Sequence, residues 1–318
     1  MSSLSPHPEL AEAEGPPLVG QPQTLRDILA NTAIQNPTSN AVISCYQNSQ
    51  LLPVPNTPPQ DDPAKTVWTY KQLVEAADRL AASFYSRGIR KNMHVVVFLY
   101  NSAEWALLFW TCAKLGATFV PLDARGVPGK EAVLYFLKVT EPAVLVVSDS
   151  PAAVALQQSH EALLRDIPLK LTVESDDAFP SQWACLADVM SCFEASTADS
   201  SDCDGIEINP QQDIALMVFT SGTSGLPKAC PHSGKILWAA CMAADVIRPR
   251  GPMDSVVQHI PCPHIFACWD MLSFWSAGPT VIFPSKVSDP KATLDAIETE
   301  QCTHMSGKLC IVKFCSLA

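Results

Sequence analysis

The 318-residue sequence is poor in charge, and positive charge is especially scarce. Charged residues make up 17% of the chain, against about 25% in an average soluble protein. The formal net charge is −11, and no Lys or Arg lies between Lys170 and Lys228, a stretch with ten acidic residues. Because Lys and Arg supply most non-specific affinity for nucleic acids, this composition argues against a nucleic-acid-binding protein. The acidic stretch is interpreted as a solvated face or loop.

The sequence also lacks an uninterrupted apolar run long enough to cross a membrane. Its most apolar stretch, residues 103–122, contains Glu104, Lys114 and Gly116, and is therefore interpreted as a buried helix followed by a strand. No secretory signal opens the chain, and its last three residues are not a peroxisomal signal, so a cytoplasmic location is expected. Residues 1–23 are rich in Pro, Ser and Glu, and are predicted to form a disordered tail.

The 12 cysteines do not follow a disulfide or zinc pattern. A chain of this length does not need disulfides to fold. Two similar triplets, Cys230-Pro231-His232 and Cys262-Pro263-His264, offer soft metal ligands, with Cys268 nearby. Neither triplet has Cys-x-x-Cys spacing, so buried, unreactive thiols are favoured over a metal site and no metal is predicted.

Strand and helix patterns alternate along most of the chain. Residues 24–35 are predicted to form a helix capped by Thr24, and Asn101 is predicted to cap a later helix with Glu104 completing a capping box. Other strands are predicted at 94–100, 117–121, 142–148, 214–220, 255–260 and 279–283, and other helices at 129–139, 233–247, 266–277 and 290–300. Such alternation predicts an α/β fold with two doubly wound, mainly parallel sheets packed through helices.

The weakly periodic, Ser-rich residues 175–210 divide the pattern in two. They are predicted to connect a first α/β subdomain, residues 24–174, to the start of a second, residues 211–307. Residues 308–318 continue neither pattern and are treated as a divergent C-terminal segment.

The strongest functional signal follows the apolar run at residues 214–218, which is typical of a buried strand. The next ten residues are Phe219-Thr220-Ser221-Gly222-Thr223-Ser224-Gly225-Leu226-Pro227-Lys228. Small residues let a backbone turn tightly and direct its N–H groups at an anion, especially a phosphate. The four hydroxyl groups add hydrogen-bond donors, and Lys228 adds a mobile positive charge.

Two other interpretations of this segment are weaker. A flexible Gly/Ser linker explains the glycines but neither the preceding strand nor the Pro-Lys pair. A Walker phosphate loop has its Lys directly after Gly and before Ser or Thr. Here Leu226 and Pro227 separate Gly225 from Lys228, and Ala229 follows.

The segment resembles the phosphate loop of the adenylate-forming superfamily, which includes acyl-CoA synthetases, luciferases and peptide-synthetase adenylation domains. The usual form is Tyr-Thr-Ser-Gly-Thr-Thr-Gly-x-Pro-Lys-Gly, from which this chain departs at Phe219, Ser224 and Ala229. The resemblance covers residues 24–307, because further similar segments occur in the expected order at 68–73, 101–105, 114–123, 264–266, 277–281 and 303–307.

The resemblance implies an acid–thiol ligase that acts on a small carboxylic acid. A carboxylate would attack the α-phosphorus of ATP to give an acyl adenylate and pyrophosphate, and a thiol, commonly coenzyme A, would then displace AMP. Residues 220–225 and Lys228 are expected to hold the β- and γ-phosphates with Mg²⁺. His264 matches a position that borders the acyl pocket, and a hydrogen-bonded core histidine is the alternative.

The resemblance stops at Gly307. Family members continue to an adenine-binding Gly-rich motif, a Glu that holds Mg²⁺, an Asp that binds the ribose and a C-terminal domain with a Lys, and residues 308–318 match none of these. The sequence therefore predicts an incomplete enzyme, from a truncated gene model, a splice variant or a pseudogene, that does not turn over. The alternative is a non-catalytic remnant that binds nucleotide weakly or acts as an interaction module.

Overall fold

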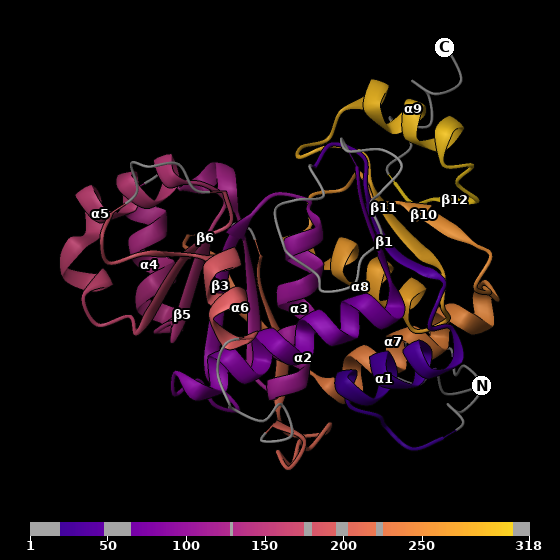
Figure 1. Cartoon of the computed structure of the whole chain (residues 1–318), viewed down its shortest axis with the longest axis horizontal. Coiled ribbons are helices and arrows are strands. Elements are labelled where there is room, and N and C mark those ends of the chain that lie inside the picture. Colours follow the sequence, from indigo (N-terminus) through magenta and orange to yellow (C-terminus); the bar gives the residue numbers. More distant parts are fainter. Residues whose placement is uncertain are drawn as a thin grey trace, which may run out of the picture.

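A computed structural model of the chain describes residues 20–47, 65–127, 130–174, 180–194, 203–220 and 225–307. These residues form two β-sheets with helices between and around them (Figure 1). The predicted α/β fold with mainly parallel sheets is confirmed. Most of the predicted tail, the segment 308–318 and residues 221–224 of the predicted phosphate loop lie outside the described residues.

Within the described residues, one sheet has seven strands in the order β7-β6-β5-β3-β4-β8-β9. All neighbours are parallel except β8 and β9, which are antiparallel. The strands are β3 (His94–Leu99), β4 (Thr118–Asp123), β5 (Val144–Val147), β6 (Leu169–Thr172), β7 (Ala184–Cys185), β8 (Ile214–Thr220) and β9 (Lys228–Ser233).

The second sheet, over the same described residues, has five strands in the order β12-β10-β11-β1-β2. Only β1 and β2 are antiparallel. The strands are β1 (Asn40–Ser44), β2 (Thr66–Thr69), β10 (Ser255–Val257), β11 (Thr280–Phe283) and β12 (His304–Met305).

The two sheets do not follow the predicted subdomain boundaries. Strand β1, from the first predicted subdomain, pairs with β11, with Val42 opposite Val281. Strand β8, from the second, pairs with β4, with Phe119 opposite Leu216. Each sheet therefore contains strands from both predicted subdomains. Strands far apart in the sequence can pair, and a local sequence pattern does not show such pairing.

Helices cover both faces of the seven-stranded sheet, and further helices pack on the five-stranded sheet. They are α1 (Leu25–Gln35), α2 (Tyr70–Ser86), α3 (Ala103–Leu115), α4 (Lys130–Thr140), α5 (Ser150–Leu164), α6 (Leu186–Glu194), α7 (Gly234–Ile247), α8 (Ile265–Trp275) and α9 (Pro290–Thr299). Along β3, Val95 and Val97 face the core shared with α2 and α3, whereas Val96 and Phe98 face α4 and α5. This alternation explains why the strand is apolar throughout.

An aromatic cluster joins the two sheets through α3 and α8. The Trp275 ring of α8 lies 5.5 Å from that of Trp110 and 6.2 Å from that of Phe109, both on α3. Its indole Nε1 donates a hydrogen bond to the Ala41 carbonyl of β1 at 2.9 Å. Helix α8 is therefore fixed against both α3 and the five-stranded sheet.

The predicted cap of α1 is confirmed, but that of α3 is wrong. Thr24 Oγ1 accepts from the Asp27 N–H, and the Asp27 side chain completes the capping box. At α3 the cap is Ser102, whose Oγ accepts from the Trp105 N–H at 3.1 Å. Asn101 precedes the helix and makes other contacts, described below.

Part of the predicted acidic connection forms regular structure. Strand β7 and helix α6 lie within it, and α6 packs on α2. Ser83 Oγ of α2 donates to the Val189 carbonyl at 2.9 Å. The apolar side chains of Leu186, Val189 and Met190 are buried there, which accounts for a helix in a segment with weak periodicity.

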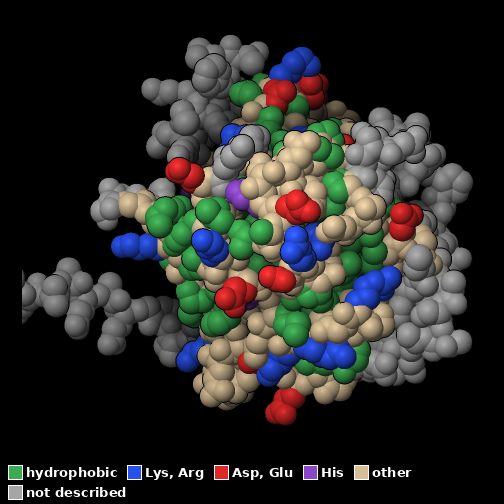
Figure 2. All heavy atoms as spheres, turned by 90° about the vertical axis from the view of Figure 1, so that its left-hand side faces the viewer, with side chains coloured by type: hydrophobic (Ala, Val, Ile, Leu, Met, Phe, Trp, Pro, Cys, Tyr) green, Lys and Arg blue, Asp and Glu red, His purple; other side chains and the backbone are tan. Residues whose placement is uncertain are grey.

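The described surface at the α4 and α5 end carries charges of both signs. Figure 2 faces this end and shows Lys and Arg side chains mixed with Asp and Glu, without a patch of one sign. Among the helices of the described residues, none combines the length and the apolar character that a membrane crossing requires.

Candidate phosphate and acid site

The two ends of the predicted phosphate loop meet in an antiparallel ladder. Thr220, the last residue of β8, is directly opposite Lys228, the first residue of β9, and Phe219 is opposite Ala229. Residues 221–224 lie outside the described part of the chain. The described residues therefore place the threonine and the lysine of the motif on neighbouring strands.

Strand β9 is an element that the sequence analysis does not predict, and Pro231 lies in the middle of it. Proline cannot donate to a ladder and is normally excluded from central strands. Strand β9 is the last strand in the sheet order, so Pro231 pairs with Met217 on one side only. A proline at the edge of a sheet is tolerated, and it blocks further pairing there.

The predicted loop follows the carboxyl end of β8 in the sequence, and β8 runs parallel to β4. Ligands in open α/β sheets bind beyond the carboxyl ends of strands. Thr220, Gly225 and Lys228 are all exposed. Helix α4 supports the far side of the loop, because Tyr135 Oη donates to the Pro227 carbonyl at 2.6 Å.

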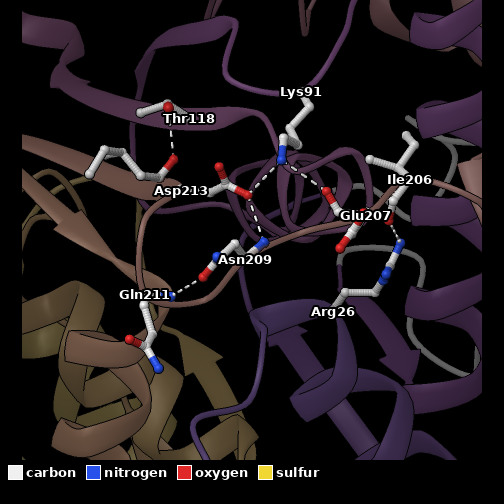
Figure 3. Close-up of polar contacts among 9 residues, drawn as sticks. Arg26, Lys91, Thr118, Ile206, Glu207, Asn209, Gln211 and Asp213 are labelled. Carbon is white, nitrogen blue, oxygen red and sulfur yellow. Dashed lines mark hydrogen bonds and ion pairs between the residues drawn. The ribbon is translucent and has the colours of Figure 1, made fainter.

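A segment that we call the strap, residues 203–213, leads into β8 and is held at its end by Lys91 (Figure 3). Lys91 Nζ donates to the Glu207 carbonyl and to the Asp213 carboxylate, both at 2.9 Å. The same Asp213 oxygen accepts from the Asn209 N–H at 2.7 Å. At the start of β8, Thr118 Oγ1 of β4 donates to the Ile214 carbonyl at 2.7 Å.

Two further cations hold the earlier part of the strap. Arg26 of α1 donates to the Ile206 carbonyl at 3.0 Å, and Lys114 of α3 pairs with Asp204 at 2.7 Å and with Asp78 at 2.9 Å. Burial alone would lower the pKa of Lys114, but the two carboxylates outweigh it and raise the pKa. Asp204 and Asp213 of the acidic stretch, which was interpreted as a solvated face or loop, thus pair with Lys114 and Lys91.

His264 is exposed and caps α8, in contrast to the alternative of a core histidine. Its Nδ1 accepts a hydrogen bond from the Phe266 N–H at 3.2 Å. It follows β10 of the five-stranded sheet, whereas Lys228 belongs to the seven-stranded sheet. The two predicted site residues therefore come from different sheets.

Strand β9, which begins with Lys228, and helix α8, which His264 caps, contact each other. The His232 ring of β9 lies 5.9 Å from the Trp269 ring of α8, edge to face. Burial lowers the pKa of His232, which favours the neutral imidazole. Trp269 and Phe266 remain 37% and 45% exposed, so α8 presents apolar surface close to its capped end.

A hollow of about 210 Å³ opens where the carboxyl ends of β3 and β4 approach the loops that follow β10 and β11. Arg125 pairs with Asp123 at 2.6 Å on one side, and Lys286 pairs with Glu174 at 2.9 Å on the other. Its lining is Leu99, Tyr100, Asn101, Asp123, Arg125, Pro261, Pro263, Lys286, Val287 and Ser288.

The two Cys-Pro-His triplets lie in β9 and in the loop before α8. Cys262 and Cys268 are buried, and the Cys268 thiol donates to the Cys262 carbonyl at 3.1 Å. Burial raises the pKa of both thiols. Among the described residues, no group of three or more His, Cys, Asp or Glu side chains is arranged to hold a metal ion.

The family model described as "AMP-binding enzyme" matches residues 53–308, which is most of the chain. The chain belongs to the AMP-binding enzyme family. The resemblance to the adenylate-forming superfamily is thereby confirmed.

Among curated relatives, the AMP-binding chain is 31% identical over 240 residues to an indoleacetate–CoA ligase of Aromatoleum aromaticum. The match covers 74% of this chain and 43% of the relative, so the chain spans less than half of the relative's length.

Solved structures share the fold. The apo structure of MbtA from Mycobacterium smegmatis has a TM-score of 0.67 and 26% identity, covering 90% of this chain and 48% of that chain. The inhibitor-bound N-terminal domain of FACL13 from Mycobacterium tuberculosis has a TM-score of 0.70 and 19% identity, covering 92% and 64%.

Proposed function

We propose that this chain carries the ATP phosphate site of an AMP-forming ligase that activates a carboxylic acid. The observation that carries the proposal is the direct pairing of Thr220 with Lys228, the residues on either side of the Gly-rich segment that follows β8. The segment thus has a hydroxyl at one end and a cation at the other. Membership of the family and the name of the indoleacetate–CoA ligase relative support the same chemistry.

The residues at the turn fit a phosphate in their chemistry. Thr220 offers a hydroxyl donor, Lys228 a positive charge and Gly225 an accessible backbone, and all three are exposed. We propose that residues 220–225 and Lys228 together hold the β- and γ-phosphates. Because no metal-binding group occurs among the described residues, Mg²⁺ is proposed to arrive on ATP.

In the proposed reaction an acid carboxylate oxygen attacks the α-phosphorus, a P–O bond forms, and the bond to pyrophosphate breaks. A thiolate, from coenzyme A or a carrier, then attacks the acyl carbon, and AMP leaves with the C–O bond electrons. Phosphoryl transfer depends mainly on positioning and on neutralising charge, which is the role proposed for the turn. Phe266 and Trp269, beside His264, are proposed to contact the apolar part of the acid.

Calorimetric titration of the full chain with MgATP tests the phosphate site. Lys228→Ala is expected to weaken binding about 10- to 150-fold, because a hydrogen bond to a charged group contributes about 1.5–3 kcal/mol. Lys235→Ala is the matched control, because Lys235 is an exposed lysine just beyond the other end of β9. Binding that Lys228→Ala leaves unchanged would contradict the proposed phosphate site.

Acid activation is tested separately by pyrophosphate release with a panel of aryl and fatty acids. Acid-dependent release that Lys228→Ala abolishes supports the ligase. MgATP binding without acid-dependent release agrees with the expectation that this chain does not turn over, and it leaves phosphate binding as the role of these residues. The two assays therefore separate binding from chemistry.

A further inference from the structure

Asn101 lies two residues after β3 and is 2% exposed, and its side-chain amide makes three hydrogen bonds to one distant segment. Its Nδ2 donates to the carbonyls of Gln258 at 3.2 Å and Ile260 at 2.9 Å. Its Oδ1 accepts from the Cys262 N–H at 2.8 Å. One amide therefore makes three hydrogen bonds to the loop that joins β10 to α8.

The backbone of Asn101 is joined to two more segments of the five-stranded sheet. Its N–H donates to the Lys286 carbonyl, after β11, at 3.3 Å. Its carbonyl accepts from the Tyr46 hydroxyl, after β1. The carboxyl end of β3, in the seven-stranded sheet, is thus connected through Asn101 to the segments that follow β1, β10 and β11.

The β10–α8 loop has few hydrogen bonds of its own. Gln258 N–H donates to the Ile282 carbonyl at 2.7 Å, Gln258 Nε2 donates to the Ile260 carbonyl at 2.8 Å, and His264 N–H donates to the Pro261 carbonyl at 3.0 Å. Removing the Asn101 amide takes a donor from the Gln258 carbonyl and an acceptor from the Cys262 N–H. Buried backbone groups without partners are strongly disfavoured, so the loop would move.

We propose that Asn101 is a positioning residue, whose amide fixes the course of residues 258–264 and so sets where His264 and the start of α8 stand. Pro261 and Pro263 line the hollow described above, so the same contacts fix one of its walls. The link to acid binding rests on the proposed function of His264. The positioning of the loop does not, and it is tested independently.

Only a side chain that both donates and accepts can replace the Asn101 amide at this position. Donors and an acceptor are needed on one short side chain, and Asn offers both. An ionised Asp has no donor for the two carbonyls, and Ala has neither group. A protonated Asp regains one O–H donor and keeps an acceptor.

Thiol alkylation of the full chain measures the loop directly. Cys262 and Cys268 are buried beside it, whereas Cys112 and Cys241 are buried elsewhere and serve as references. With iodoacetamide and peptide mass spectrometry, Asn101→Ala should accelerate alkylation of Cys262 and Cys268 about tenfold or more over the natural chain. The reference thiols should keep their rates.

Tyr46→Phe is the matched control, because it removes a hydrogen bond at the same junction without touching residues 258–264. It should change the Cys262 and Cys268 rates by less than about twofold. Equal acceleration of all four thiols by Asn101→Ala would mean general destabilisation and would overturn the proposal. Unchanged rates at Cys262 and Cys268 would overturn it as well.

Asn101→Asp gives a readout that packing alone would not produce. At pH 8 it should behave like Asn101→Ala, and its alkylation rate relative to the natural chain should fall toward one as the pH is lowered to about 5.5. The ratio for Asn101→Ala should stay constant, and an equally constant ratio for Asn101→Asp overturns the proposed donor role. The nearby titratable and charged groups are common to the natural chain and to both Asn101 variants, and they cancel in the ratio: Tyr46, Glu104, Asp123, Arg125, Glu174, His259, Cys262, His264 and Lys286.

The same variants separate this proposal from the phosphate site. Asn101→Ala should leave any MgATP affinity within about twofold, and Lys228→Ala should leave the Cys262 rate unchanged. A chain that fails to bind ATP refutes the phosphate site and leaves the alkylation result to decide the role of Asn101.

Discussion

Replacing Asp213 tests how firmly the strap is joined to the body of the protein before β8 begins. The Asp213 carboxylate accepts from Lys91 Nζ at 2.9 Å and from the Asn209 N–H at 2.7 Å. The Asp213 side chain is 12% exposed and that of Lys91 is 33% exposed, so solvent screens the pair in part. Hydrogen bonds to charged groups contribute about 1.5–3 kcal/mol, and exposed ion pairs about 0.2–1 kcal/mol.

From these values, Asp213→Asn should lower the free energy of unfolding by about 1–2 kcal/mol, because it keeps an acceptor and loses the charge. Asp213→Ala should lower it by about 2–3 kcal/mol, because it loses both contacts. Urea unfolding followed by tryptophan fluorescence measures both changes. Asp166→Asn, at an exposed aspartate, is the control and should stay within about 0.5 kcal/mol of the natural chain.

The pH dependence provides a second measurement. Burial alone would raise the pKa of Asp213, but hydrogen bonds from Lys91 and Asn209 outweigh it and hold the pKa below its ordinary value. A carboxyl group with a lowered folded pKa contributes stability above its unfolded pKa, about 3.9, and loses it as the pH falls through the folded pKa. The difference between Asp213→Asn and the natural chain should therefore be constant from pH 8 to about 5 and shrink below about pH 4. Equal stability of the two proteins at pH 7 would refute the reasoning.

Two further substitutions test the interior. Burial raises the pKa of Glu104, so the folded state holds its proton more tightly and stability falls as the pH rises above the ordinary glutamate value of about 4.3. Glu104→Gln should flatten this fall in urea unfolding between pH 5 and 8, and an unchanged slope would contradict it. Gly116 ends α3 at φ +67°, and an added Cβ would lie 3.0 Å from Ile208 of the strap. Gly116→Ala should lower the free energy of unfolding by about 1–3 kcal/mol, as measured by the same method, against a Gly205→Ala control where no atom lies within 4 Å.

Elements that depend on neighbours in sequence were predictable from the sequence alone. The cap of α1 and the strand before the Gly-rich turn lie where expected, at Thr24 and at Ile214–Thr220. Each is specified by a local pattern, a capping box in the first case and an apolar run in the second. Strand β9 was not predictable, because Pro231 argues against a strand until its position at the sheet edge is known.

The cap of α3 shows why the rest of the site needed the structure. Asn101 and Ser102 are both good cap residues, so the local pattern allows either. The choice is made by the contacts of Asn101 with Gln258, Ile260 and Cys262, between 157 and 161 positions away in the sequence. A pattern of neighbouring residues cannot identify partners so far away in the sequence. For the same reason it cannot show that each sheet contains strands from both predicted subdomains. Residues 221–224 of the predicted phosphate loop lie outside the described residues, so their role stays a prediction.

The pairing of β1 with β11 has a consequence for how the chain is made. Thr280 Oγ1 of β11 donates to the Asn40 carbonyl of β1 across 240 positions of sequence. At about 5–20 residues per second, a ribosome needs about 10–50 s between these two residues. During that interval β1 can pair with β2 but not with β11, and the sheet that buries Ala41, Val42 and Ile43 is incomplete. Contacts of such long range slow folding, because the chain must close a long loop before they form, and a chaperone that shields the early strand would act during this interval.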